Sequence, residues 1–292
     1  MKLFNKITAC ALAALMTLLA PVVMAADSYI SLNGFSFSIN SNGEAVIYEY
    51  DGDETNVVIP EKLLGAYVAE ISSYAFNGNS SIKTVDLGNA SRLSRIGDNA
   101  FNGCSSLSEI TIPETVEEIG FGAFQNCCEL KTAVINGNIS ELPSQCFYNC
   151  ENLSSIKLSD SIAKIGEFAL SECDSLTHIT IPNSVSEISD NAFSGSDDIR
   201  ILCERGSDAY EYAQSMNIDT VVPDECPLGD VNLDGKVDII DVTQIQKYKI
   251  GDSKAIDTEL QLRLADVNRD GKVTIRDATL IQMYLAKYFD QF

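Results

Sequence analysis

A phenylalanine recurs along the middle of the chain at a nearly constant interval, and this repeat limits the possible folds more than any other feature. From Phe101 onward the step is 23 residues, and only the step from Phe76 is longer, at 25. One such repeat cannot bury its apolar face alone, whereas stacked repeats share a continuous core, so the sequence predicts a solenoid. The column consists of Phe76, Phe101, Phe124, Phe147 and Phe193, with Leu170 in the same register.

Short strands and end caps are predicted around this column. The alternation over 109–112, stopped by Pro113, predicts a strand with two residues facing inward. A hairpin is predicted within residues 29–60, turning at 40–43, where it would shield the first coil. A helix over 207–216, with Ser207 as its N-cap, is expected to cover the last coil. The predicted fold class is α+β.

The repeat columns resemble the leucine-rich repeats of the BspA-like class over about residues 57–203. The resemblance is carried by Ile119-Gly120, Ala123-Phe124, Cys127, Leu130 and Ile112-Pro113. It implies a β-solenoid, and bacterial proteins of this class are commonly secreted or surface-exposed, some of them adhesins. What such repeats bind varies, so the resemblance implies ligand binding without naming the ligand.

The cysteines allow two interpretations. Eight remain after Cys10 is set aside, and an even number in a secreted chain is typical of a disulfide set. However, one cysteine follows three residues after the large apolar residue in four consecutive repeats, so these side chains point the same way, which is awkward for bridging. Buried free thiols acting as small apolar groups are the favoured prediction, with a Cys203–Cys226 or a Cys127/Cys128 bridge as the alternatives. The column is Cys104, Cys127, Cys150 and Cys173.

Two twelve-residue segments near the carboxyl end have the composition of calcium-binding loops. They begin at Asp230 and Asp266 and share the spacing Asp-x-Asn-x-Asp-Gly-Lys, with an Asp at the twelfth place. Such loops supply oxygen ligands at alternate places, the seventh through its backbone carbonyl, and glycine at the sixth place permits a sharp turn. Because the pattern occurs twice, the sequence predicts two calcium ions. The candidate ligands are Asp230, Asn232, Asp234, Lys236, Asp238 and Asp241 in the first loop, and Asp266, Asn268, Asp270, Lys272, Thr274 and Asp277 in the second.

The loops depart from a standard EF-hand in having Asp at the twelfth place and no helix entering the first loop, where Pro227 precedes it. A helix is predicted after each loop, over 242–249 and 278–287. This duplicated loop-then-helix pattern resembles a type I dockerin over about residues 228–290. The resemblance implies calcium-dependent binding to a cohesin module of a scaffoldin, within a cellulosome. It also implies cohesin contacts at Ile239, Ile240, Gln246, Lys247, Ile275, Arg276, Gln282 and Met283.

The charge balance and the rare residues exclude several function classes. The 42 acidic residues outnumber the 20 basic ones, for a net charge of −22, which argues against nucleic acid as a partner. The chain has one histidine, His178, without a triad evident in the sequence, so a His-centred hydrolase is not indicated. It has no tryptophan, and the predicted strand faces carry no aromatic stripe on which sugar rings could stack.

The amino terminus predicts export. Lys2 and Lys6 precede an apolar run over 7–19, and small residues end at Ala25, which is the layout of a cleaved signal peptide. The run is shorter than the roughly 20 apolar residues of a membrane span. The predicted organisation is a signal peptide at 1–25, a capped repeat domain at 26–222, a linker at 223–228 and a dockerin at 229–292.

Together these features predict a secreted, extracellular, non-catalytic protein associated with a cellulosome. Its dockerin would bind a cohesin, and its repeats would bind an unknown protein or surface ligand. The first alternative is an adhesin that binds plant polysaccharide or a cell surface. The second is an enzyme or enzyme inhibitor carried on the scaffold.

Overall fold

The computed structural model describes residues 29–252, 255–256 and 258–292, and the predicted signal peptide lies outside them. The described chain forms two compact units. The first runs to Ile201 and also takes in Gly206–Ile218. The second consists of Leu202–Arg205 and Asp219–Phe292.

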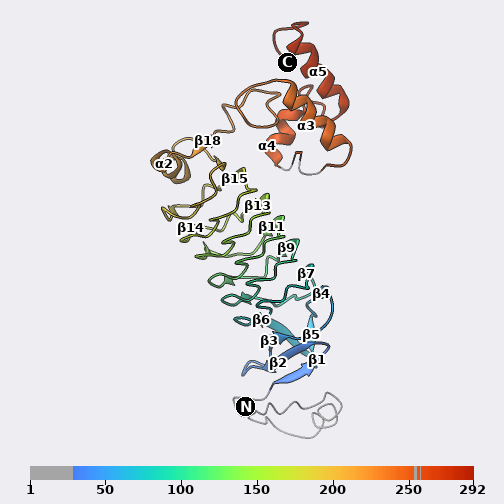
Figure 1. Ribbon diagram of the computed structural model, residues 1–292, viewed down its shortest axis with the longest axis vertical. Helices are drawn as coiled ribbons and strands as arrows, with labels where there is room; N and C mark the ends of the chain where they lie inside the picture. Colours follow the sequence, from blue (N-terminus) through green and yellow to red (C-terminus); the bar gives the residue numbers. More distant parts are fainter. Residues whose placement is uncertain (1–28, 253–254, 257) are drawn as a thin grey trace. The chain divides into compact units, whose positions relative to one another are not determined.

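Each coil of the first unit contributes a short strand, as the alternating pattern predicts (Figure 1). In β9, Ile110 and Ile112 are buried while Glu109 and Thr111 face solvent. Neighbouring strands pair in parallel and in register, so that Ile110 lies beside Ala133. The inward residues of successive coils therefore stack on one another. These strands are β4 (Asn56–Val58), β7 (Thr84–Asp86), β9 (Glu109–Ile112), β11 (Thr132–Ile135), β13 (Ser155–Lys157), β15 (His178–Thr180) and β17 (Arg200–Leu202).

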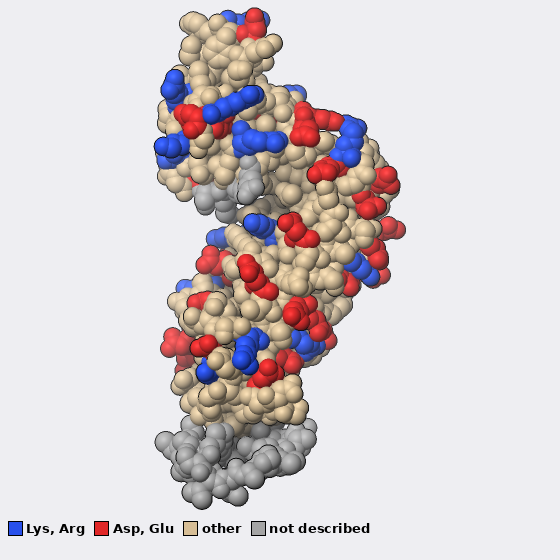
Figure 2. All heavy atoms as spheres, turned by 180° about the vertical axis from the view of Figure 1, so that it is seen from behind, with Lys and Arg blue, Asp and Glu red and all other residues tan. Residues whose placement is uncertain are grey.

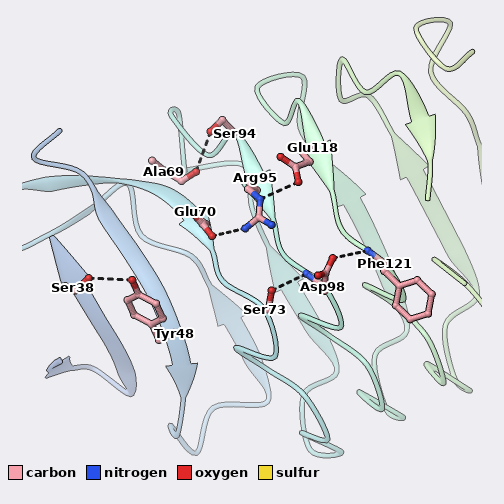
Figure 3. Close-up of polar contacts among 10 residues, drawn as sticks. All are labelled: Ser38, Tyr48, Ala69, Glu70, Ser73, Ser94, Arg95, Asp98, Glu118 and Phe121. Carbon is pink, nitrogen blue, oxygen red and sulfur yellow. Dashed lines mark hydrogen bonds and ion pairs between the residues drawn. The ribbon is translucent and has the colours of Figure 1, made fainter. Parts of the chain in front are cut away.

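A second ladder of shorter parallel strands runs along the other side of the coils. Its outward positions carry two basic side chains, each between two acidic ones: the Arg95 guanidinium donates to Glu70 at 2.6 Å and to Glu118 at 3.1 Å (Figure 3). Lys164 lies between Glu141 and Glu187 in the same way, at 3.8 and 3.3 Å. The strands are β6 (Ala66–Ile71), β8 (Arg95–Ile96), β10 (Glu118–Ile119), β12 (Glu141–Leu142), β14 (Lys164–Ile165) and β16 (Glu187–Ile188).

The predicted hairpin at the start of the solenoid is confirmed. Strands β2 (Phe35–Ile39) and β3 (Ala45–Tyr50) pair antiparallel, and the Asn40 side chain closes the turn by accepting from Asn42 N and Glu44 N. β3 then pairs in parallel with β6, so the hairpin continues directly into the solenoid. Strands β1 (Ile30–Leu32) and β5 (Lys62–Leu63) pair antiparallel with β2 and β6.

The repeated phenylalanines form a stack of rings inside the coils. From Tyr50 through Phe147, consecutive ring centroids lie 4.8–5.4 Å apart and the planes are tilted by 21° or less.

The column cysteines lie beside this stack as buried free thiols. Each thiol donates to the backbone carbonyl of the large residue one coil earlier, at 3.2–3.3 Å. Ser196 makes the same bond to the Leu170 carbonyl at 3.0 Å. The column is therefore one of hydrogen-bonded thiols and not of disulfides.

The expected cap helix is also confirmed, as α2 (Asp208–Ser215). The Ser207 hydroxyl accepts from Tyr210 N at 3.2 Å, which is the N-cap contact that the sequence predicts. Ala209 and Ala213 are buried on its inner face. The ring of Tyr212 lies 6.1 Å from that of Phe193, the last member of the apolar column. This helix therefore covers the final coil.

The second unit is mainly helical, with β18 (Asp219–Val221), α3 (Ile239–Lys249), α4 (Glu259–Ala265) and α5 (Ile275–Leu285). Its core joins Val231, Val242, Ile245 and Ile281, and the partly buried Val237 and Val273 pack against it. The predicted helix starts at 242 and 278 are wrong, because α3 and α5 begin three residues earlier. The predicted class is confirmed: a leucine-rich repeat solenoid of about eight turns, then a small helical region.

Candidate functional site

The two predicted calcium loops have the same backbone conformation. Their fourth residues, Leu233 and Arg269, are left-handed, with φ of 59° and 58°. Gly235 and Gly271 at the sixth place have φ of 84° and 81°, a region that glycine enters without a steric penalty. The duplicated sequence is therefore also a duplicated structure.

The first carboxylate of each loop is held by the turn that follows it. The two oxygens of Asp230 accept from Asp234 N and Gly235 N, at 3.1 and 2.9 Å. Asp266 makes the equivalent contacts with Asp270 N and Gly271 N, at 3.1 and 2.8 Å. These bonds fix the carboxylate at the centre of the loop.

The twelfth residue of each loop is a fully buried aspartate, Asp241 or Asp277. Asp241 accepts from Val231 N at 2.7 Å, from Asn232 N at 3.0 Å and from Asp238 N at 2.7 Å. Asp277 accepts from Asn268 N at 3.4 Å and from Thr274 N at 2.8 Å. Each side chain thus closes its loop by joining the end to the beginning.

The other candidate ligands either close turns within the loops or cap the helices that follow them. At the third and fifth places, each side-chain oxygen accepts from the backbone two residues later, as Asn232 does from Asp234 N at 3.1 Å. Asp234 accepts likewise from the backbone of Lys236, the seventh residue, at 2.9 Å. At the ninth place, Asp238 and Thr274 are the N-caps of α3 and α5. This capping explains the early helix starts, since an N-cap sets the first residue of a helix.

The donor set fits a hard cation. Carboxylate, amide and backbone oxygens at alternate loop positions are the ligands that calcium takes in proteins. Burial raises the pKa of Asp230 to about 6 and also raises that of Asp241, because it outweighs the backbone hydrogen bonds that both carboxylates accept. In the second loop, the buried Asn268 amide nitrogen has no hydrogen-bond partner among the described residues. No group of three His, Cys, Asp or Glu side chains placed to hold a metal ion is found in the described part of the chain.

The residues implied as cohesin contacts are on α3 and α5. All eight are exposed, including Gln246 and Lys247 on α3 and their counterparts Gln282 and Met283 on α5. Ile239 and Ile240 in the first turn of α3 are 58% and 50% exposed, and Ile275 in α5 is 51% exposed. One isoleucine of the first pair could instead have belonged to the core, but each is at least half exposed, so neither does.

Two features of this unit escaped the sequence prediction. Helix α4 is set by a capping box, in which Thr258 and Gln261 exchange bonds. Buried Gln261 then donates to the Val231 carbonyl of the first loop at 3.0 Å. The spacing Thr-x-x-Gln could have revealed this helix. A small apolar cluster also joins Leu233 to Leu264, Leu202 and Val221, which no local pattern predicts.

Comparison with known proteins agrees with both geometries. A model of the BspA type leucine rich repeat region matches residues 69–200 in 6 copies. A dockerin type I domain model matches residues 228–286, which include both loops. The chain carries a BspA-type leucine-rich repeat region followed by a type I dockerin domain. Type I dockerins typically bind calcium, and the dockerin implies cohesin binding in a cellulosome and an extracellular location. Both matched modules are non-catalytic.

Solved structures resemble the repeat region at low identity. A leucine-rich repeat protein of T. pallidum is 27% identical, covers 59% of this chain and 70% of its own, and has a TM-score of 0.44. A leucine-rich repeat protein from Eubacterium ventriosum is 25% identical, with coverage of 57% and 51% and a TM-score of 0.44. No curated protein matches the chain.

The surface of the repeat region is acidic and polar. Figure 2 shows Asp and Glu side chains along the edges of the solenoid on the face that is drawn. Among the described residues, no helix is long and apolar enough to cross a membrane. The repeat region suggests binding of a protein or another ligand, and its surface favours partners other than polyanions.

Proposed function

We propose that this protein is a secreted, non-catalytic cellulosome component that is tethered by a calcium-loaded dockerin and that holds a protein or surface ligand on its repeats. The observation that carries the tether is the pair of matched loops, each with a buried twelfth-position aspartate. One calcium ion in each loop would compensate these carboxylates. The loops pack against the helices that bear the docking surface, so metal binding would be coupled to folding.

The docking surface is proposed to be the outward face of α3 and α5. Ile239, Ile240 and Ile275 provide exposed apolar area at the helix starts, and polar side chains follow one to two turns later. Ile240 aligns with Arg276, and Lys247 with Met283, so the two halves offer different chemistry. The first half is the more apolar at its helix start and is proposed to make the main contact with the cohesin.

The tether is tested by binding of the full chain to an immobilised type I cohesin in calcium and in chelator. We expect binding only with calcium, and its loss in the double variant Asp241→Ala, Asp277→Ala. Lys236→Ala is the matched control, because the seventh position serves through its backbone and should tolerate the change. Equal binding in chelator, or unchanged binding by the double variant, would refute the tether.

The docking surface is tested separately by paired substitutions. Ile239→Asp with Ile240→Asp is expected to abolish cohesin binding while leaving the calcium-dependent helical signal intact. The matched change in the second half, Ile275→Asp, is expected to weaken binding less. Retention of full affinity by the first variant would show that the cohesin uses another surface.

A further inference from the structure

The turns that follow the second ladder form one edge of the solenoid, here called the corner edge. It consists of residues 72–79, 97–104, 120–127, 143–150, 166–173 and 189–196. We propose that the corner edge binds a neutral polysaccharide, with Tyr74 and Phe121 as stacking surfaces. This inference rests on the ligand-binding role proposed for the repeats and names the class of ligand.

Two aromatic residues occupy strained backbone positions on this edge. The residue before the small corner residue has positive φ in successive coils, because its N–H is fixed to the next coil: Tyr74 N donates to the Asp98 carbonyl at 3.0 Å. Gly122 and Asn99 suit this conformation at φ of 59° and 53°. Tyr74 and Phe168 adopt it at 64° and 55°, where a bulky side chain costs free energy. Phe168 packs edge-on against the Tyr148 ring, with centroids 6.5 Å apart, whereas Tyr74 is 59% exposed, so packing within the coils does not explain the aromatic residue at position 74.

The rings of Tyr74 and Phe121, the two proposed stacking surfaces, are exposed to solvent. Tyr74 is 59% exposed and Phe121 is 43% exposed. Asp98 holds the backbone of Phe121 in place. Its carboxylate accepts from Phe121 N at 2.9 Å, and its own N–H donates to Ser73 Oγ at 3.1 Å (Figure 3). An exposed ring on a rigid backbone loses little entropy when a ligand stacks on it.

A chain of side-chain amides runs along the same edge. Asn149 Nδ2 donates to Asn126 Oδ1 at 2.9 Å, and Asn126 donates to Asn102 at 3.0 Å. Asn102 donates to Asn99 at 3.2 Å, and Asn99 donates to the Tyr74 hydroxyl at 3.4 Å. Each amide has a second N–H and a second lone pair, which suit the mixed donors and acceptors of sugar hydroxyls. The network orders these groups before any ligand arrives.

The chemistry of the edge favours a neutral glycan over a protein or an acidic glycan. Its segments contain no Lys, Arg or His, and their charged residues are all acidic: Asp98, Glu167, Glu172 and Asp190. A polyanion would therefore be repelled. Protein interfaces are enriched in Arg and Met as well as aromatic residues, and the edge has neither. Tyr74 and Phe121 belong to coils two steps apart, about 10 Å along the stack at the spacing of paired strands.

The test is affinity electrophoresis of the full chain through gels that contain hydroxyethyl cellulose, xylan or galactomannan. Carboxymethyl cellulose provides the same type of backbone with negative charge. At least one neutral polymer is expected to retard the protein, and the anionic polymer is expected to do so less at low salt. Retardation by none of the neutral polymers, or equal retardation by the anionic one, would overturn the proposal. Cohesin binding by the same preparation shows whether only this inference fails.

Variants separate recognition from folding. Phe121→Ala and Tyr74→Asn are expected to weaken polysaccharide binding about tenfold each. Tyr74→Asn should not lower Tm, because asparagine suits the left-handed backbone and already occupies that place in the next coil. Tyr288→Ala removes an aromatic residue that is 76% exposed in the other unit and is the control, with unchanged binding expected. If the edge variants bind polysaccharide as the native chain does, or lose only a protein partner, the proposal is wrong.

Discussion

The Cys127 thiol donates a hydrogen bond to the carbonyl of Phe101 in the preceding coil, at 3.3 Å. The same bond recurs along the cysteine column, and the Phe101 carbonyl also accepts from Cys104 N at 3.1 Å, so the thiol uses the second lone pair of that oxygen. A thiol is small, apolar and able to donate, and these three properties suit the site. The column therefore supports the phenylalanine stack beside it without any covalent cross-link.

These thiols should make the repeat region sensitive to alkaline pH. Burial raises the pKa of Cys104 and Cys173 to about 12. In the unfolded chain a thiol ionises near pH 8.5, so stability is full below that pH and falls as pH rises toward the folded value. The loss is up to about 1.4 kcal/mol per pH unit for each thiol. Urea unfolding between pH 7 and 10 should show this slope, and it should be shallower in Cys104→Ser, since Ser196 shows that a hydroxyl can make the same bond.

Phe101 should be replaceable by leucine but not by alanine. Leu170 occupies the same column in another coil and is fully buried there, so the site accepts a branched aliphatic side chain. Phe101→Ala is expected to reduce the free energy of unfolding by about 3–5 kcal/mol through loss of burial and a residual cavity. Phe101→Leu should cost less than half as much. Denaturant titration of both variants measures the two losses of unfolding free energy. Equal losses would contradict the conclusion that the Phe101 site accepts leucine as the Leu170 site does.

The ion pairs on the outward positions of the second strand ladder should contribute little to stability. Arg95 contacts Glu70 and Glu118, but its side chain is 33% exposed, so water and salt screen the attraction. Arg95→Met is expected to cost no more than about 1 kcal/mol at low salt, and the difference should disappear in about 1 M salt. Unfolding titrations at both salt concentrations measure the effect. A large loss that persists at high salt would show that the arginine stem packs a core contact instead.

The sequence predicts the solenoid well because equivalent positions in successive coils are buried in the same way and therefore carry similar apolar residues. Phe76 and Phe101 face the same environment, so their spacing reveals the coil directly. The first residues of α3 and α5 were placed too late because the loop pattern and the N-cap overlap at Asp238 and Thr274. The sequence does not show Tyr74 and Phe121 as an aromatic stripe, because the two residues stand at different positions of the repeat.

The fourth residue of each dockerin loop provides a matched pair with opposite expected outcomes. Leu233 and Arg269 share the left-handed conformation, at φ of 59° and 58°. Leu233 is buried in the cluster with Leu202, Val221 and Leu264, whereas Arg269 is exposed. Asparagine tolerates this conformation better than either residue. Arg269→Asn should therefore leave stability unchanged or raise it by up to about 1 kcal/mol.

Leu233→Asn should lower the stability of the same unit by about 2–4 kcal/mol, because it removes an apolar side chain from the cluster and places an amide there. Thermal unfolding of both variants in saturating calcium, followed through the helical signal, tests the pair. The comparison holds the backbone strain constant, so the difference reports packing alone. Equal melting temperatures would show that the cluster does not stabilise the dockerin, and that the left-handed leucine is there for another reason.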